Sequence, residues 1–487
     1  NGHMESNSFS TLVSAVCGTI IKGALALHKE VSENFRKTAA NFHYEFNIRH
    51  LANVFAGLLV ATPHIFSDAE KFVCLWLHES ERVYGDRLVD FDDLDKFKQL
   101  LLGQARKNFP QYNIGKYYLS GGGVASDPLI FCHFADGHAQ PEDLQYDQAF
   151  NLTDVRKSLD AALEEYNETN AVMNLVLFDD AVCHVARIVR IVKQTGGHAL
   201  LVGVGGSGKQ SLSRLAAFVC GYKVVQIMVN QTYSLLDFRT DLQSMYNTAG
   251  VKLEGVLFLM TDTQIVNEKF MVYINDLLSS GNIPDLYNKD EKEAIVNSCT
   301  GKAKAAGYSA DPDQVWQYFI SRIREHLHVC LCFSPVGPSL RTRARRFPAL
   351  ANCTVIDWFQ PWPQQALASV GQKVLGDIEL GEQEVQMAVE NFMPTAFVEV
   401  NKLCKKFGDE QGRYVYTTPK SYLEMLSLYQ HMLSSKRAET DKKIFRLESG
   451  VEQLLRAAEA VEMLESNLKI MMESAEEKVR VVVFFVP

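Results

Sequence analysis

Apolar residues recur at helical spacing through the first hundred residues of the chain. The spacing predicts four helices, over residues 9–36, 51–60, 67–84 and 91–102. A glycine-rich break follows at residues 120–124, and the next apolar run, 129–134, predicts a strand. We therefore expect an all-helical domain over residues 5–125, followed by a domain of a different class.

The middle of the chain alternates short apolar runs with amphipathic segments. Five runs predict buried strands, at residues 199–202, 222–227, 255–260, 327–333 and 354–358. Helical spacing precedes and separates them, over residues 152–166, 179–192 and 235–246. Because strands and helices alternate, we expect an α/β fold over residues 126–365, with a mostly parallel sheet covered on both faces.

Helical spacing returns after this α/β region. We expect a small helical domain over residues 366–430, with helices at 383–392 and 397–407. From residue 423 onward the apolar residues follow an alternating three–four seam. The seam consists of Leu423, Leu426, Leu433, Ile444, Leu447, Val451, Leu454, Ala458, Val461, Leu468, Met472 and Ala475.

Heptads sustained over this length, with Glu, Lys and Arg around them, predict a coiled-coil strand over residues 431–478. A long surface helix packed on the domain is the alternative. Since one strand cannot bury its own seam, a partner strand must come from outside this chain or from another copy. Residues 479–487 abandon the heptad and predict a β-prone end.

Composition narrows the classes of function. The 487 residues suffice for about three domains, and 47% hydrophobic with 22% charged residues is ordinary for a globular protein. A formal net charge of −9 argues against a nucleic-acid partner. No apolar run reaches the roughly 18 residues that a membrane span needs, so we expect no membrane partner. The ten cysteines include no CxxC pair, which favours free thiols in a reducing cytoplasm over a zinc site or disulfides.

The segment after the first strand of the sheet is typical of a phosphate-binding loop. It consists of Gly203, Val204, Gly205, Gly206, Ser207, Gly208, Lys209, Gln210 and Ser211. Glycines let consecutive backbone N–H groups surround an anion, the following helix adds its positive end, and Lys209 reaches the phosphates. An ordinary glycine-rich turn is the alternative. The hydroxyl that normally holds magnesium is missing at Gln210, and Ser211 lies roughly 100° further round the helix.

The residues that hydrolysis requires are incomplete. After the strand at 255–260 the chain continues with Thr261, Asp262 and Thr263, so one carboxylate is present where an ATPase needs two. Ser334 follows the next strand of the pattern, where a longer polar sensor is usual. We therefore predict nucleotide binding with little or no hydrolysis, and Asp262 is at most a degenerate catalytic residue.

Two further groups of residues are candidates for contacts with a nucleotide. The first is the apolar segment made of Val176, Leu177 and Phe178. This segment precedes a helix upstream of the loop, where an adenine pocket is expected, although plain core packing explains each residue equally well. The second is the basic set Arg343, Arg345 and Arg346. These arginines form either a solvated basic face or a contact to the nucleotide of a neighbouring subunit.

Several stretches together resemble a known family. They are residues 203–211, 258–265, 274–281, 332–337 and 347–359. In these stretches the chain resembles the motor of an axonemal dynein heavy chain, and within it the fourth of six concatenated AAA+ modules. The helical N-terminal part resembles the small lid domain of the third module. The C-terminal heptads resemble the outgoing strand of the antiparallel stalk.

The resemblance implies roles for individual residues at the nucleotide. Lys209 and the loop glycines match the Walker A positions. Asp262 matches the catalytic acid, whereas Thr261 replaces the Walker B aspartate. The implied ligand is ATP or ADP, with Mg²⁺ at Ser211 and Asp262.

The resemblance also implies roles at the edges of the module. Arg49 and Lys420 match the second sensors of the third and fourth modules, respectively. Cys353 stands at the position of the usual arginine finger. Activation of the third module's site from this chain would then require one of the basic set at residues 343–346.

The function implied is that of a regulatory, weakly or non-hydrolysing module of an ATP-driven, minus-end-directed microtubule motor that moves cilia and flagella. Implied partners are the neighbouring AAA+ modules, the second stalk strand, dynein intermediate and light chains, and the microtubule through the stalk tip. The implied location is the cytoplasm and cytoskeleton, at the axoneme. A free-standing P-loop ATPase and a vestigial structural module that links ring to stalk are the alternatives.

Overall fold

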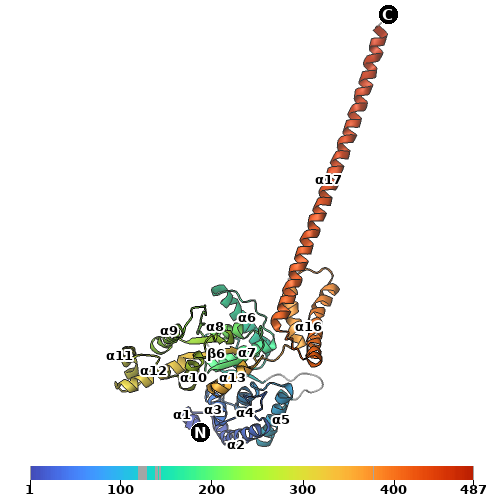
Figure 1. Ribbon diagram of the computed structural model, residues 1–487. Coiled ribbons are helices and arrows are strands. Elements are labelled where there is room, and N and C mark those ends of the chain that lie inside the picture. The colour runs from blue at the N-terminus through green and yellow to red at the C-terminus, as the bar shows by residue number, and fades with distance from the viewer. Residues whose placement is uncertain (1, 119–128, 138–140, 142–143, 377, 486–487) are drawn as a thin grey trace.

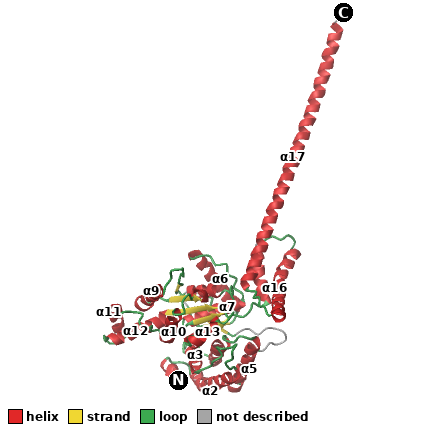
Figure 2. Ribbon diagram, viewed as in Figure 1, coloured by secondary structure: helices red, strands yellow, loops and turns green. Residues whose placement is uncertain are grey.

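A head of three packed parts carries one long helix in the computed structural model (Figure 1). The structure describes residues 2–118, 129–137, 141, 144–376 and 378–485. The long helix, α17 (Pro419–Phe485), begins in the head and projects far from it. Among the described residues, the strands of the main sheet lie in the middle of the head, with helices around them (Figure 2). The glycine-rich break predicted at residues 120–124 lies outside the described residues.

The N-terminal part of the head is helical, and the four predicted helices are confirmed. Its elements are α1 (Gly2–Ser6), α2 (Thr11–Asn34), α3 (Ile48–Leu58), α4 (Ala69–Ser80), the π-helical turn η1 (Glu81–Gly85), α5 (Phe91–Asn108) and the 3-10 turn η2 (Ile114–Tyr117). Side chains of Ser10, Asn47 and Asp68 accept backbone N–H groups at the starts of α2, α3 and α4. Trp76 is fully buried among these helices.

Helix α2 bears on the expectation that no segment of the chain is long and apolar enough to span a membrane. Its 24 residues are long and apolar enough to cross a membrane by length and composition. Val13, Ile20 and Leu27 form a fully or almost fully buried stripe along it, which is typical of a core helix in a helical domain.

Five parallel strands form the central sheet, and all five were predicted. They are β3 (Ala199–Val202), β4 (Lys223–Val225), β5 (Val256–Thr261), β6 (Leu327–Phe333) and β7 (Val355–Trp358), in the order β4-β5-β6-β3-β7. Side chains alternate between two cores. Leu200 and Val202 face one core, whereas Ala199 and Leu201 face the other.

Helices cover both faces of this sheet, as the alternation of strands and helices predicted. The first core lies under α9 (Leu235–Tyr246), α10 (Phe270–Ser280), α11 (Lys289–Ala305) and α12 (Pro312–His326). The second lies under α6 (Leu152–Thr169), α7 (Asp179–Val192) and α8 (Lys209–Val219). The remaining elements are the turns η3 (Asn247–Lys252) and η4 (Asp262–Gln264) and the short helices α13 (Ser339–Arg346) and α14 (Ala349–Asn352).

A small hairpin joins the N-terminal helices to the α/β part. β1 (Ile130–Cys132), within the strand predicted at 129–134, pairs antiparallel with β2 (Asp147–Ala149). β1 contacts both α4 and α7. The side chains of β1 alternate between the two cores, with Phe131 in the N-terminal core and Ile130 and Cys132 in the core under α7.

Two predictions for the C-terminal part are wrong in detail. Residues 383–392 and 397–407 form one helix, α16 (Gln383–Gln411), which continues through Pro394. Met393 and Pro394 are buried, and α16 packs along α15 (Gln364–Leu375), so packing offsets the hydrogen bond that the proline removes. The predicted β-prone end at residues 479–487 is helical through Phe485, because each added residue extends the helix by one hydrogen bond. Residues 486–487 lie outside the described residues.

The alternative of a helix lying on the domain is also wrong. The first turns of α17 are packed in the head, where Tyr422 and Leu426 are completely buried. Beyond these turns the seam residues are exposed, for example Leu454 at 73%. The seam therefore leaves the head without a partner among the described residues.

Candidate functional site

The predicted phosphate loop connects β3 to α8 at the carboxyl edge of the sheet. Gly206 and Gly208 have φ angles of +78° and +87°, which only glycine adopts without strain. Gly208 is the N-cap of α8, and the N–H of Gly203 donates to the carbonyl of Phe333 at 3.1 Å. The loop thus wraps the positive end of α8, an arrangement suited to an anion.

Lys209 lies inside this loop. Its Nζ donates to the carbonyl oxygens of Gly203 at 2.7 Å and Val204 at 2.8 Å, and to the Ser207 Oγ at 3.1 Å. Burial lowers the pKa of Lys209 from its ordinary value. A phosphate that binds here exchanges neutral acceptors for a charged one, so the ammonium favours it.

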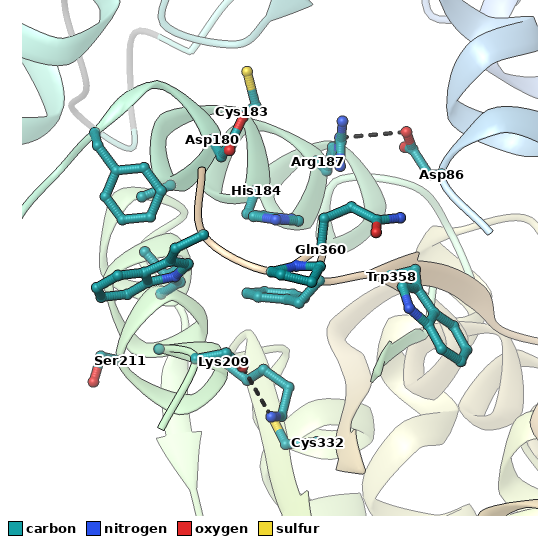
Figure 3. Close-up of a pocket in the computed structure, with 18 of the residues that line it drawn as sticks. Asp86, Asp180, Cys183, His184, Arg187, Lys209, Ser211, Cys332, Trp358 and Gln360 are labelled. Carbon is teal, nitrogen blue, oxygen red and sulfur yellow. Dashed lines mark hydrogen bonds and ion pairs between the residues drawn. The ribbon is translucent and has the colours of Figure 1, made fainter. Parts of the chain in front are cut away.

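A cavity of about 1360 Å³ opens beside the loop (Figure 3). Predicted residues that line it are Gly205, Gly206, Ser207, Gly208, Lys209, Gln210, Ser211, Val176, Phe178, Asp262 and Ser334. Predicted residues that are not part of its described lining are Gly203, Val204, Leu177, Lys420, Arg343, Arg345 and Arg346. The structure therefore gathers most of the predicted nucleotide-binding residues around one space.

The apolar end of this cavity is built from two segments far apart in the sequence. Phe178 meets Trp362 edge to face, with ring centroids 5.1 Å apart, and Val176 and Val370 lie beside them. Leu177 points elsewhere and is buried in the core under α7. Trp362 was missed by sequence reasoning, although an aromatic residue between two prolines just after the last strand was a usable signal.

The acidic position at the end of β5 is occupied by hydrogen bonds within the protein. Asp262 Oδ2 accepts the backbone N–H of Ser334 at 3.1 Å. The hydroxyls of Thr261 and Thr263 lie 2.9 Å apart, and the N–H of Thr261 donates to Gln264. Asp262 therefore links the ends of β5 and β6.

The donor set fits poorly with a metal ion held by protein ligands. Among the described residues there is no cluster of three or more His, Cys, Asp or Glu side chains that could hold one. The Gln210 amide oxygen accepts from Gln226 Nε2 at 3.3 Å, and Gln226 also contacts Arg214. Of the two predicted magnesium positions, Ser211 carries no charge and Asp262 supplies one carboxylate, whose Oδ2 also accepts a backbone N–H, so these positions offer at most one anionic ligand.

The predicted basic residues lie on α13, away from this loop. Arg343 donates to Glu268 Oε1 at 3.0 Å and is mostly buried, whereas Arg345 and Arg346 are exposed. Arg49 of α3 donates to the Cys353 Sγ at 3.1 Å. Arg49, matched to the second sensor of the third module, and Cys353, at the position of the usual arginine finger, are therefore in contact.

Lys420 reaches the loop with its backbone instead of its ammonium. A Cβ on Gly206 would lie 2.3 Å from the Lys420 Cβ and 2.9 Å from its backbone nitrogen. The Lys420 side chain is 69% exposed, and its Nζ pairs with Glu424 Oε1 at 3.5 Å. The first turn of α17 therefore touches the phosphate loop directly.

Sequence reasoning missed a buried polar group on the opposite wall of the cavity. His184 Nδ1 lies 2.6 Å from Asp357 Oδ2, and Arg187 donates to Asp357 Oδ1 at 2.9 Å (Figure 3 shows His184 and Arg187 on α7). Burial alone would raise the pKa of Asp357, but His184 and Arg187 hold it below its ordinary value. No sequence motif could have revealed these contacts, because α7 and β7 are far apart in the chain.

Comparisons with known proteins agree on one family. A model described as the P-loop containing dynein motor region D4 matches residues 173–432, and an AAA+ lid domain model matches residues 20–115. The chain is 48% identical over 478 residues to the dynein alpha chain of the flagellar outer arm of Chlamydomonas reinhardtii, covering 98% of this chain and 10% of that protein. It is 43% identical over 487 residues to dynein axonemal heavy chain 17 of Homo sapiens, covering 99% and 11%.

A third relative is similar over the same span. The ciliary dynein beta chain of Tripneustes gratilla is 44% identical over 466 residues, covering 96% of this chain and 10% of the relative. The chain thus spans about a tenth of the length of the curated relatives it matches. Among solved structures, a mutant of RuvB from Thermotoga maritima aligns at 11% identity over 60% of this chain and 72% of its own, with a TM-score of 0.23.

Proposed function

Because this chain belongs to the axonemal dynein heavy chains, as part of their P-loop AAA+ motor region, we propose that its loop holds ADP or ATP in a regulatory role. The observation that carries the proposal is the position of Lys209, whose Nζ lies inside a loop capped by two left-handed glycines beside a large cavity. The phosphates occupy the loop, and the base lies toward Val176, Phe178 and Trp362.

We propose that the module hydrolyses its nucleotide weakly or not at all. Thr261 replaces one carboxylate, and Asp262 is hydrogen-bonded to the backbone of Ser334. The metal shell would therefore lack the carboxylate that Thr261 replaces, and Asp262, held by its Oδ2 to Ser334, is the one carboxylate left at this position to orient a water molecule. If Mg²⁺ accompanies the nucleotide, its oxygen ligands come mainly from the phosphates and water, since Gln210 supplies no hydroxyl.

Nucleotide occupancy acts on α17 in this proposal. Lys420 packs on Gly206, and Leu423 lines the same cavity three residues further along the helix. A bound nucleotide bridges the α/β part and the base of α17, which favours the closed arrangement of the two. The observed geometry supports a link from the phosphate loop to the stalk.

The wider assignments are also proposals. The parent heavy chain is a minus-end-directed microtubule motor of the axoneme, and the exposed seam of α17 takes the second stalk strand. Neighbouring AAA+ modules, intermediate and light chains, and the microtubule at the stalk tip are its partners. Arg345 and Arg346 are the exposed candidates for a contact with the preceding module's nucleotide, because Arg343 is bound to Glu268.

The test is direct binding of ADP and ATP to the purified chain. Lys209→Ala should weaken binding at least tenfold, while Lys223→Ala removes an exposed lysine on β4 and should leave affinity unchanged. Equal affinity of wild type and Lys209→Ala would overturn the site assignment.

Two alternatives make different predictions in the same assays. A free-standing P-loop ATPase predicts magnesium-dependent turnover that Asp262→Asn abolishes. A vestigial loop predicts no rise in melting temperature at millimolar ATP or ADP. A rise in melting temperature without turnover matches the regulatory proposal alone.

A further inference from the structure

At the end of β7, alternate residues contact two different parts of the head. Trp358 and Gln360 contact the N-terminal helical part, whereas Asp357 and Phe359 contact the α/β part. The N–H of Trp358 donates to the Asp86 carbonyl at 2.9 Å, and Gln360 Nε2 donates to the carbonyls of Leu88 and Val89 at 3.2 and 2.9 Å. These contacts reach the N-terminal helical part. Asp357 and Phe359, which alternate with these two residues, face the opposite way, as the pleat of an extended chain requires.

Phe359 lies against the start of the phosphate loop. Its N–H donates to the Val202 carbonyl at 2.8 Å, and a Cβ on Gly203 would lie 2.7 Å from the Phe359 Cβ. The Phe359 ring stacks on His184, with centroids 3.8 Å apart and planes within 4°. A shift of Phe359 therefore must displace either the loop or His184, because interiors packed this closely do not deform smoothly.

A chain of buried polar contacts runs from this stack to the N-terminal helical part. His184 bonds Asp357 at 2.6 Å, Arg187 bonds Asp357 at 2.9 Å, and the Arg187 Nε lies 3.3 Å from Asp86 Oδ1. The Asp357 side chain is 1% exposed and that of Asp86 5%. Figure 3 shows the contact between Arg187 of α7 and Asp86 of the N-terminal helical part.

Charges buried to this degree tolerate little separation. Asp86 also pairs with Arg82 at 3.1 Å, so removing its charge takes one buried carboxylate from two guanidinium groups, Arg82 and Arg187, and the surrounding groups rearrange. If Asp86 moves with the N-terminal helices, Arg187 and Asp357 follow, and the stack on Phe359 moves with them. The same displacement is transmitted along the backbone by the bond from Trp358 to Asp86.

We infer that Phe359 is a positioning residue for the phosphate loop and that the N-terminal helical part sets its position through Asp86, Arg187 and Asp357. The inference rests on the proposed nucleotide binding at Lys209. It assigns a regulatory input to that site: the arrangement of the preceding helical domain determines how well the loop holds a nucleotide.

A second ion pair between the same two parts supplies a matched control. Glu79 of α4 accepts from Arg190 of α7 at 3.0 Å and from the Tyr146 hydroxyl at 2.5 Å. Glu79 is 0% exposed, so this pair is at least as buried as the first. The described contacts of Glu79 do not include Phe359 or the phosphate loop.

The experiment compares ADP affinity in three variants with that of the wild-type chain. Asp86→Asn should weaken ADP binding at least fivefold, whereas Glu79→Gln should change it less than twofold while lowering the melting temperature. In a Phe359→Leu background, Asp86→Asn should change affinity less than twofold, because the relay no longer reaches the loop. A merely structural role of Asp86 would instead leave the two effects additive.

A measurement on the wild-type chain covers the case in which Asp86→Asn does not fold. ADP should slow hydrogen exchange in the peptide that carries Trp358 and in residues 86–89, but not at the far strand β4. Equal effects of Asp86→Asn and Glu79→Gln on ADP affinity would overturn the inference, as would exchange at Trp358 that ADP leaves unchanged. Failure of the wild type to bind ADP would instead overturn the proposed function.

Discussion

Gly206 lies directly beneath Lys420, so the phosphate loop and the first turn of α17 share one contact. A Cβ at Gly206 would stand 2.3 Å from the Lys420 Cβ, closer than any two such atoms pack. Gly206 also has a φ of +78°. This position therefore has two reasons to be glycine, one local and one that depends on α17.

Gly206→Ala should loosen the base of α17. The alanine meets Lys420 and also adopts a left-handed backbone, which costs about 1–2 kcal/mol. Hydrogen exchange in residues 419–423 should accelerate, and the free energy of unfolding should fall.

Gly208→Ala is the control for the backbone strain alone. Gly208 has a φ of +87°, but the nearest atom to an added Cβ is 3.7 Å away, on Leu212. Exchange in residues 419–423 should therefore stay at the wild-type rate. Equal acceleration in both alanine variants would contradict the direct contact.

Gly57→Ala should disrupt the junction between α3, α4 and α7. An added Cβ would lie 1.6 Å from Glu79 Oε2, so the carboxylate that pairs with Arg190 has to move. We expect a loss of about 3–5 kcal/mol in the free energy of unfolding by urea, as for other broken buried pairs. The matched control is Gly103→Ala in α5, where nothing lies within 4 Å of the added carbon. It should stabilise by about 0.4–1 kcal/mol, and a loss below 1 kcal/mol for Gly57→Ala would refute the steric argument.

Acidification should destabilise the fold from about pH 6.5 downward. Burial, the main cause, lowers the pKa of His43 to about 4 and those of His133 and His198 to about 3. Below their ordinary value of 6.5 the unfolded chain binds protons that the folded chain refuses, so stability falls as pH falls. Each histidine contributes up to about 1.4 kcal/mol per pH unit, a slope approached well below pH 6.5 and above the pKa of the folded chain. Burial raises the pKa of Asp86, so the folded chain takes up one proton at this carboxyl before the unfolded chain does. This uptake opposes the loss of stability on acidification, but only by a single group.

Urea unfolding at pH 7, 6 and 5 measures this slope. His43→Phe removes one of the titrating groups and keeps a ring that stacks on Trp358, now 5.0 Å from His43. The decrease in the free energy of unfolding per pH unit should then be smaller by the contribution of one histidine. A slope equal to that of the wild type would show that His43 titrates normally in the folded chain.

The exposed seam of α17 should drive association. Leu454 and Val461 are 73% and 54% exposed, and they belong to the three–four seam. Replacing both by Glu should weaken self-association, or binding of a complementary strand, at least tenfold in sedimentation experiments. Leu455 and Met463 are 61% and 68% exposed but lie off the seam. Glu at these two positions should change association little, and an equal effect of both pairs would argue against a coiled-coil seam.

Local patterns were sufficient for the elements of the fold. The apolar runs of the five strands and the spacing of the four N-terminal helices depend on neighbouring residues, so each could be predicted from the sequence. The same holds for the loop at Lys209, whose glycines are required by the backbone conformation itself. The missing hydroxyl at Gln210 and the single carboxylate at Asp262 are also facts of the sequence alone.

Tertiary packing decided that α16 is continuous, and it decided which side chains of one segment line the cavity and which are buried in the core. Pro394 would end an isolated helix, but packing against α15 keeps α16 intact. The segment at Val176 and Phe178 lines the cavity while Leu177, between them, is buried in the core, a choice that depends on Trp362 and α7.

The sequence by itself determined that a phosphate loop is present, that its hydrolytic residues are incomplete, and that a long apolar seam follows. Only the tertiary structure decided what the loop touches. Lys420 over Gly206 and Phe359 against Gly203 bring together residues separated by more than a hundred positions. Periodicity reports the face of an element and not its neighbour, so contacts of this kind arise only when the whole chain packs.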